Sequence, residues 1–173
     1  MNLIAAVDKN WAIGRNDELL FRIRADLRRF KEITKGNIVI CGRRTVQTFP
    51  GGKPLAGRIN LIMSRQTDLE IEDAVMCRDK SELFAELKRL YSEGYYSSQI
   101  YVIGGASIYR LLMPYCSEAI ITYIHASVEN ADCHLPDFDA LPEWRLKEIS
   151  ELMSENDVSF EYRTYINPDP KTW

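Results

Sequence analysis

Short apolar segments that alternate with amphipathic segments are the feature that most constrains the fold of this 173-residue chain. Most of the apolar segments contain no polar residue, which is typical of strands buried on both faces of a largely parallel sheet. The expected strands are Leu3–Val7, Ile38–Cys41, Ile59–Met63, Ala74–Met76, Ile100–Ile103 and Ala119–Ile124.

The amphipathic segments between these strands predict helices. Ser81 is expected to cap the second helix and Gly94 to end it. Pro114 is expected to stop the third helix. The expected helices are Arg24–Thr34, Ser81–Glu93, with an apolar face of Leu83, Leu87 and Leu90, and Ala106–Met113.

The C-terminal segment follows a different pattern. Side chains alternate in character from Phe160 to Ile166, and with Trp144–Ser150 this segment predicts an antiparallel hairpin at the edge of the sheet. The alternation of strands and helices before it predicts an α/β fold. We expect a doubly wound, mostly parallel central sheet of about eight strands, with helices on both faces. The length favours a single domain over residues 1–173.

Composition disfavours several classes of function. The formal net charge of −3 is a poor fit to a nucleic-acid binder. The four cysteines form no C-x-x-C pair and only two histidines are present, so no metal site is expected. The opening MNLIAAVDKN has no basic region and only a short apolar run. We therefore expect a cytoplasmic protein with reduced thiols and no membrane association.

Asp26 is the strongest candidate for a chemically active acid. It lies in the first turn of the helix expected at Arg24–Thr34, four residues before Phe30 and seven before Ile33, and therefore on the apolar stripe. A carboxylate on such a stripe needs a partner, a hydrogen bond or a proton. Acids are also common on the surface of first turns, where they interact with the helix dipole, so both interpretations remain open at this stage.

Two further patterns point to a phosphate-bearing ligand. Gly104-Gly105 joins an expected strand to an expected helix, and this either forms a tight turn or lets the backbone approach a ligand. Arginines follow three expected strands at their carboxyl ends, where doubly wound sheets bind ligands. Solvated arginines would give the same pattern, but the shared location favours phosphate contacts from Arg43, Arg44, Arg65 and Arg78.

Nearly the whole chain resembles the dihydrofolate reductase family. The resemblance is carried, in order, by LIAAVDKNWAIG, IGRNDELLFRIRADLRRFK, CGRRTVQTF, PLAGRINLIMSR and YVIGGASIY. It implies that NADPH reduces 7,8-dihydrofolate to 5,6,7,8-tetrahydrofolate by hydride transfer. It also implies an enzyme of tetrahydrofolate synthesis that supplies one-carbon metabolism and is inhibited by antifolates. We expect a monomer, because the length of the chain suffices for a closed core.

The resemblance further implies roles for residues at matching positions. Asp26, Thr122 and Phe21 form the implied catalytic set, in which Asp26 promotes protonation of the substrate and Thr122 hydrogen-bonds both this acid and the pterin. Arg58 is expected to bind the carboxylate of the glutamate tail. The other implied substrate-binding residues are Ile4, Ala5, Leu27, Phe30, Phe49, Leu55, Ile103 and Tyr109. The implied cofactor-binding residues are Ala6, Ile13, Gly14, Gly42, Arg43, Arg44, Thr45, Ser64, Arg65, Arg78, Gly104, Gly105, Ala106, Ser107 and Ile108.

The segment before the acid departs from the family pattern. The family usually has L-P-W-x-L-P where this chain has LLFRIR at residues 19–24. Phe21 lacks an indole N–H, and both prolines are replaced, so the loop at residues 9–20 is expected to be less rigid. We expect Arg22 and Arg24 to lower the pKa of Asp26. Gly104-Gly105 resembles the cis peptide of the family.

Two other classes of function are compatible with the sequence. One is another NADPH-dependent reductase of the same fold, of the riboflavin-pathway pyrimidine reductase type, although Asp26 and Arg58 favour a folate. The other is a non-catalytic relative that binds ligands without turning over a pterin. The net charge disfavours a nucleic-acid module, and the implied reaction requires no nucleic acid.

Overall fold

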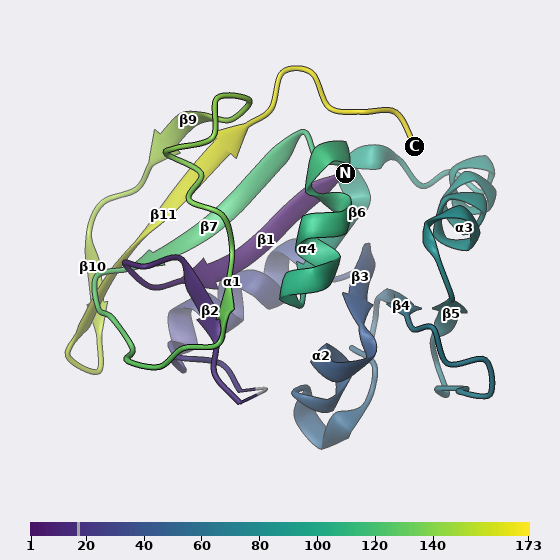
Figure 1. The fold of residues 1–173 in the computed structure, drawn as a ribbon, viewed down its shortest axis with the longest axis horizontal. Helices are drawn as coiled ribbons and strands as arrows, with labels where there is room; N and C mark the ends of the chain where they lie inside the picture. The colour runs from purple at the N-terminus through teal and green to yellow at the C-terminus, as the bar shows by residue number, and fades with distance from the viewer. Residues whose placement is uncertain (17) are drawn as a thin grey trace.

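A single mixed sheet organises the protein, whose computed structural model describes residues 1–16 and 18–173. Its nine strands run in the order β10-β11-β7-β1-β6-β3-β4-β5, with β9 also paired to β11 (Figure 1). Asp17, in the loop expected at residues 9–20, lies outside the described residues. The strands are β1 (Asn2–Val7), β3 (Ile38–Gly42), β4 (Ile59–Met63), β5 (Val75–Cys77), β6 (Ile100–Gly104), β7 (Glu118–Ile124), β9 (Arg145–Ile149), β10 (Met153–Glu155) and β11 (Val158–Ile166). A separate ribbon pairs β2 (Ala12–Gly14) with β8 (Cys133–His134).

The pairing directions confirm the expected α/β fold with a mostly parallel sheet. Strand β1 pairs in parallel with β6 and β7, and β3 pairs in parallel with β4 and β6. Strand β11 is antiparallel to β7, β9 and β10. Parallel neighbours place their carboxyl ends at one edge of the sheet, so the segments that follow β1, β3, β4 and β6 lie near one another.

Four α-helices cover both faces of the sheet in the described residues. Figure 1 shows α4 in front of the sheet and α1 behind it. Along β1, Leu3, Ala5 and Val7 belong to the core cluster that also contains residues of α3 and α4, whereas Ile4 belongs to a second cluster with residues of α1 and α2 on the other face. This alternation explains why the parallel strands are apolar throughout. The helices are α1 (Arg24–Thr34), α2 (Arg43–Gln47), α3 (Lys80–Ser92) and α4 (Ala106–Leu112), with 3-10 turns η1 (Pro50–Gly52), η2 (Ser97–Gln99) and η3 (Met113–Tyr115).

Three expected helix boundaries differ from the structure by one residue: the start of α3, its end at Ser92, and the end of α4. Helix α3 is capped by Asp79, whose carboxylate accepts from the Glu82 N–H at 2.9 Å, and not by Ser81. Aspartate is as good a cap as serine, and capping by Asp79 extends the helix by one residue. Helix α4 ends at Leu112, and Pro114 lies within the tighter turn η3, where its fixed φ is tolerated. Gly94 follows α3 with φ of 100°, a conformation that favours glycine, and the prediction there is confirmed.

The C-terminal hairpin is present but is not simply an edge. Strand β11 lies between β7 on one side and β9 and β10 on the other. Tyr165, which alternates with the apolar positions of this strand together with Glu161 and Arg163, is fully buried. Phe138 covers it, with ring centroids 5.4 Å apart, and Trp144 packs on Phe138. The long connection between β8 and β9 therefore supplies a second layer that the alternation in β11 does not reveal.

No α-helix among residues 1–16 and 18–173 is long and apolar enough to cross a membrane.

The side chain of Asp8 stabilises the turn that connects β1 to β2 through hydrogen bonds. Its side chain is fully buried, and Oδ1 accepts from the backbone N–H groups of Asn10 at 2.8 Å and Ala12 at 2.9 Å. Oδ2 accepts from the Val128 N–H at 2.9 Å. A buried carboxylate needs such donors. These three hydrogen bonds connect the loop between β1 and β2 to the segment that follows β7.

We expect Asp8→Asn to lower the free energy of unfolding by about 1–3 kcal/mol, because an amide NH2 would face a backbone N–H in place of an acceptor. Denaturant unfolding measures the change. The matched control is Asp137→Asn, since exposed Asp137 accepts one N–H, from Asp139, and asparagine can do the same. An equal effect of both substitutions would contradict the anchoring role of Asp8.

Candidate active site

Asp26 projects from the first turn of α1 toward the centre of the sheet. Thr122 Oγ1 on β7 donates to Asp26 Oδ1 at 2.5 Å, and Thr122 is only 2% exposed. Thr122 pairs with Ala6 of β1 on one side and with Tyr162 of β11 on the other. The acid and its hydroxyl partner, predicted from the resemblance, are therefore brought together by segments 96 residues apart.

The surroundings of Asp26 favour its neutral form. Burial raises the pKa of Asp26, while the hydrogen bond from Thr122 and the charge of Arg29 lower it by less. The guanidinium of Arg29 stacks over the ring of Tyr162 at 4.0 Å. We had expected Arg22 and Arg24 to lower this pKa, but both side chains are exposed and the arginine that acts on Asp26 is Arg29, one helical turn further on.

An apolar cluster lies beside this carboxylate. Ile4, Phe30, Phe49, Leu55 and Ile103 belong to one cluster on the α1 face, as expected for residues of a common pocket. The structure does not group Ala5 with them, because its side chain points to the opposite face of β1 and joins the cluster that contains Tyr109.

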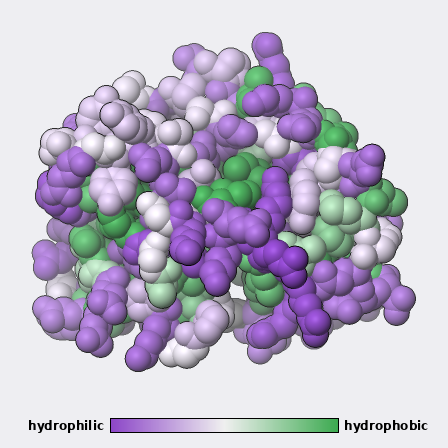
Figure 2. Space-filling model, turned by 180° about the vertical axis from the view of Figure 1, so that it is seen from behind, coloured by the Kyte–Doolittle hydropathy of each residue, from purple (hydrophilic) through white to green (hydrophobic). Residues whose placement is uncertain are grey.

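Leu27 corrects the expectation that the whole apolar stripe of α1 is buried. It is 44% exposed, although Phe30 on the same stripe is half-buried. The first turn of α1 therefore presents an apolar side chain to open space next to Asp26. In the view from the α1 side, apolar atoms show between the hydrophilic side chains that cover most of the surface (Figure 2). An exposed apolar residue beside a buried acid is typical of a ligand-binding surface.

Arg58 carries an unsatisfied polar atom close to this cluster. Its Nε is buried and has no hydrogen-bond partner in the described part of the chain. The guanidinium lies 5.9 Å from the Phe30 ring centroid, and burial lowers the pKa of Arg58. A buried N–H without an acceptor is costly, and a carboxylate is the acceptor that matches a guanidinium fork.

Three of the four glycines of the cofactor-binding prediction, Gly42, Gly104 and Gly105, lie where strand ends meet helix starts. A Cβ at Gly42 would lie 3.2 Å from Ile108, and one at Gly105 would lie 3.3 Å from the Thr45 hydroxyl. The start of α2 is thus packed directly against the start of α4. The peptide bond between Gly104 and Gly105 is cis, as the resemblance implied. Ala106, Ser107 and Ile108 form the first turn of α4 at this junction.

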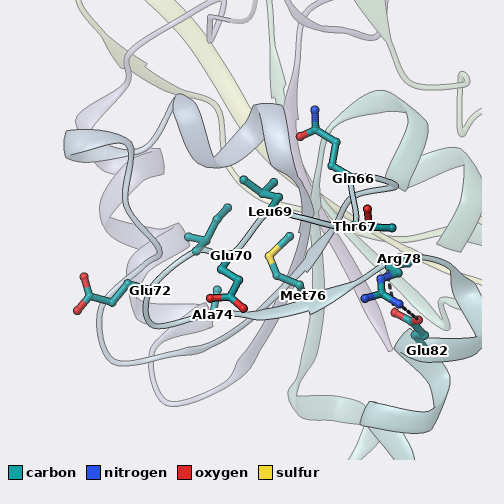
Figure 3. Close-up of a pocket in the computed structure, with 10 residues that line it drawn as sticks. Gln66, Thr67, Leu69, Glu70, Glu72, Ala74, Met76, Arg78 and Glu82 are labelled. Atoms are coloured by element: carbon teal, nitrogen blue, oxygen red, sulfur yellow. Dashed lines mark hydrogen bonds and ion pairs between the residues drawn. The ribbon is translucent and has the colours of Figure 1, made fainter.

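The predicted arginines differ in their partners. Among the described residues, no carboxylate lies within ion-pair distance of Arg43, Arg44 or Arg65. Arg78 instead forms an ion pair with Glu82 at 3.7 Å, and the Arg78 N–H donates to the other Glu82 oxygen at 2.8 Å (Figure 3). Three of the four arginines therefore keep their charge available at the strand ends.

Two cavities flank this region, and neither is centred on Asp26. One, of about 690 Å³, lies over the connection between β4 and β5, and Figure 3 shows that acidic side chains share its lining with Arg78. The other, of about 10 Å³, is lined by Ala6, Ile13 and Phe21 among others. The structure therefore brings these three predicted residues together.

Gly14 and Ser64 lie elsewhere among the predicted cofactor-binding residues. Gly14 ends β2, where an added Cβ would lie 3.2 Å from the carbonyl oxygen of Glu18. Ser64 follows β4 directly and accepts the Gln66 N–H through its hydroxyl.

Reasoning from sequence missed the aromatic and cationic partners of Asp26. Tyr162 was predicted only as part of the C-terminal hairpin, and Arg29 was not singled out at all. The spacing of Asp26 and Arg29, three residues apart on one helix, is a local signal that would have indicated their electrostatic interaction. No local signal indicates Tyr162, because its position near Asp26 depends on the pairing of β11 with β7.

We expect Asp26→Asn to increase the stability of the protein at neutral pH. The pKa of Asp26 is raised above its ordinary 3.8, so the ionised form opposes folding once the pH exceeds the folded-state pKa. Below pH 3.8 the wild type is protonated in both states and the gain should disappear. Urea unfolding across this pH range measures the difference. Asp73→Asn, at an exposed turn with φ of 61°, is the control and should show no such trend. A loss of stability for Asp26→Asn at pH 7 would contradict this account of the site.

Comparisons with known proteins agree with this geometry. Residues 1–167 match a family model described as dihydrofolate reductase. The chain is 30% identical over 167 residues to the dihydrofolate reductase of Bacillus subtilis, covering 95% of this chain and 93% of that protein. It is 33% identical to the type 3 enzyme of Salmonella typhimurium, covering 92% of each chain.

Two further matches differ in extent. A bifunctional dihydrofolate reductase-thymidylate synthase of Glycine max is 32% identical, and the chain spans 33% of that longer protein. The structure of dihydrofolate reductase from Enterococcus faecalis, complexed with NADP(H) and RAB-propyl, superimposes with a TM-score of 0.82 at 26% identity, covering 97% of this chain and 96% of that one.

Proposed function

Because the chain belongs to the dihydrofolate reductase family, we propose that it reduces 7,8-dihydrofolate to 5,6,7,8-tetrahydrofolate with NADPH. The observation that carries this proposal is the pair formed by Asp26 and Thr122, a carboxylate whose pKa is raised and which is held by a hydroxyl at the centre of the sheet. A dihydropterin needs a proton as well as a hydride, and an acid with a raised pKa is suited to promote that protonation. The second oxygen of Asp26 has no partner among the described residues and is available to the pterin.

The apolar cluster and Arg58 support a folate as the substrate. Phe30, Phe49 and Leu55 offer an apolar surface to the pterin and benzoyl rings, and Leu27 presents its exposed side chain to the same ligand. A folate ends in a glutamate carboxylate, which would satisfy the buried Nε of Arg58. An acid at one end and an unpaired guanidinium at the other would orient the substrate along α1.

The strand ends on the other side of the site fit a dinucleotide phosphate. At the glycine junction, Gly42 packs against Ile108 and Gly105 packs against Thr45, so the starts of α2 and α4 lie together where the phosphates are proposed to bind. Arg43, Arg44 and Arg65, which lack carboxylate partners in the described residues, are suited to phosphate oxygens. Arg78 contributes less in this proposal, because Glu82 offsets its charge. When bound, NADPH supplies the hydride.

The remaining site residues position the ligands and limit the access of water. Ala6, Ile13 and Phe21 surround a small cavity beside β1, and we propose that the nicotinamide end of the cofactor binds next to these side chains and not within the cavity, which has room for about one water molecule. Phe21 provides aromatic bulk there without a hydrogen-bond donor, so proton delivery depends on Asp26 and on solvent that reaches it. We also propose a single-domain, monomeric enzyme of the cytoplasm, consistent with one continuous sheet and with cysteines that lack a disulfide pattern.

We expect Asp26→Asn to reduce turnover of dihydrofolate at pH 7 by about 10²–10⁴-fold, the usual contribution of a general acid. The assay follows the loss of reduced-nicotinamide absorbance, with methotrexate as the inhibitor control. Activity should recover partly at low pH, where the substrate is already protonated.

Rapid oxidation of NADPH by the wild type with a pyrimidine substrate but not with dihydrofolate would assign the chain to another reductase of this fold. Binding of NADPH without any turnover would indicate a non-catalytic relative.

We expect Arg58→Gln to raise the KM for dihydrofolate by about 10- to 100-fold with a smaller change in kcat, because a charge-assisted pair contributes about 1.5–3 kcal/mol to binding. Steady-state kinetics at saturating NADPH measure both constants. Lys53→Gln, an exposed cation in the same connection between α2 and β4, is the matched control. An unchanged KM for Arg58→Gln would separate Arg58 from the substrate.

A further inference from the structure

Helix α1 begins without a cap of its own. The residue before it is Ile23, whose side chain cannot accept a hydrogen bond. The first intrahelical bond runs from the Leu27 N–H to the Ile23 carbonyl at 3.0 Å. The N–H groups of Arg24, Ala25 and Asp26 therefore precede the regular helical pattern and need acceptors from elsewhere.

Glu155, on the distant strand β10, supplies two of these acceptors. Its Oε1 accepts from the Arg24 N–H at 2.6 Å, and its Oε2 accepts from the Ala25 N–H at 3.1 Å. Backbone hydrogen bonds lower the pKa of Glu155, with the Arg24 bond the largest cause, so its carboxylate is charged at neutral pH. A charged carboxylate that spans two consecutive N–H groups fixes both the position and the direction of the helix start.

We propose that Glu155 is a positioning residue for Asp26, holding the first turn of α1 so that the acid meets Thr122 and keeping a negative charge beside it. This inference rests on the proposed function for its kinetic consequence. The carboxylate of Glu155 bonds the N–H of the residue directly before Asp26. Asp26 is thus fixed twice, through its own side chain by β7 and through its backbone by β10.

Strand β11 pairs with both segments that hold the first turn of α1, the one that carries Glu155 and the one that carries Thr122. Its Val158 pairs with Glu155, and four residues further on its Tyr162 pairs with Thr122. The cap and the hydroxyl partner of the acid are therefore held by the same strand. A displacement of the hairpin formed by β10 and β11 would move both contacts of the acid-bearing turn together.

Several titratable and charged groups surround Asp26 and Glu155. Asp26 is faced by Arg29 from α1, by Tyr162 from β11 and by Tyr109 from α4, while Arg24 and Arg28 lie close to Glu155. Because the Arg24 and Ala25 N–H groups donate to Glu155, they contribute less to stabilising an ionised Asp26 at the positive end of the helix. Neutralising Glu155 weakens these bonds and should therefore lower the pKa of Asp26.

The experiment compares the wild type with Glu155→Gln and Glu155→Asp, with Glu151→Gln as a matched control on the exposed turn before β10. The first readout is the titration of the Asp26 carboxylate by NMR in the protein without ligands. The second is the dependence of kcat on pH. We expect Glu155→Gln to lower the pKa of Asp26 and to reduce kcat about threefold above that pKa, because less of the acid is protonated. Glu155→Asp should restore part of both effects, and Glu151→Gln should change neither.

The two readouts separate this inference from the proposed function. Loss of thermal stability in Glu155→Gln, with an unchanged Asp26 titration and pH profile, would overturn the positioning role and leave Glu155 as a helix cap only. Absence of reductase activity in the wild type would overturn the proposed function, and the carboxylate titration would still decide whether Glu155 acts on Asp26.

Discussion

The hydrogen bond between Thr122 and Asp26 is the contact on which the rest of the site depends. A carboxylate at this depth opposes folding unless donors and cations surround it, and Thr122 and Arg29 are the groups that do so. Both faces of the parallel sheet are filled by helices and apolar side chains. Asp26 lies in the first turn of α1, where its carboxylate meets a hydroxyl on an interior strand of the sheet.

The two halves of the proposed site are built by different means. On the substrate side, the fold leaves unsatisfied or exposed groups, namely the buried Nε of Arg58 and the apolar side chain of Leu27. On the cofactor side, the junction is formed by glycines. Gly42 packs against Ile108 and Gly105 packs against Thr45 at distances that allow no Cβ without local adjustment. The first side offers complementary groups to a ligand, and the second brings the starts of two helices close together.

The parts of the molecule that sequence predicted well depend on local pattern. The bounds of α1 and β4 matched the prediction, because continuous apolarity and a 3.6-residue period are local properties. The predicted cap of α3 was wrong because Asp79, two residues before Ser81, can cap a helix equally well. Other errors arose where a distant segment changed the surroundings of a side chain. Tyr165 is buried by Phe138, a contact that no pattern within β11 indicates.

The position of β11 has a consequence for how the protein acquires its site during synthesis. Helix α1 is made early, but its first turn is completed by Glu155 and the partner of its acid is held by Tyr162 across the β7–β11 pairing. A chain emerging from the ribosome therefore carries the acid long before it carries the residues that set its chemistry. Contacts of such large sequence separation form late, so an incomplete chain contains the acid without the surroundings that raise its pKa.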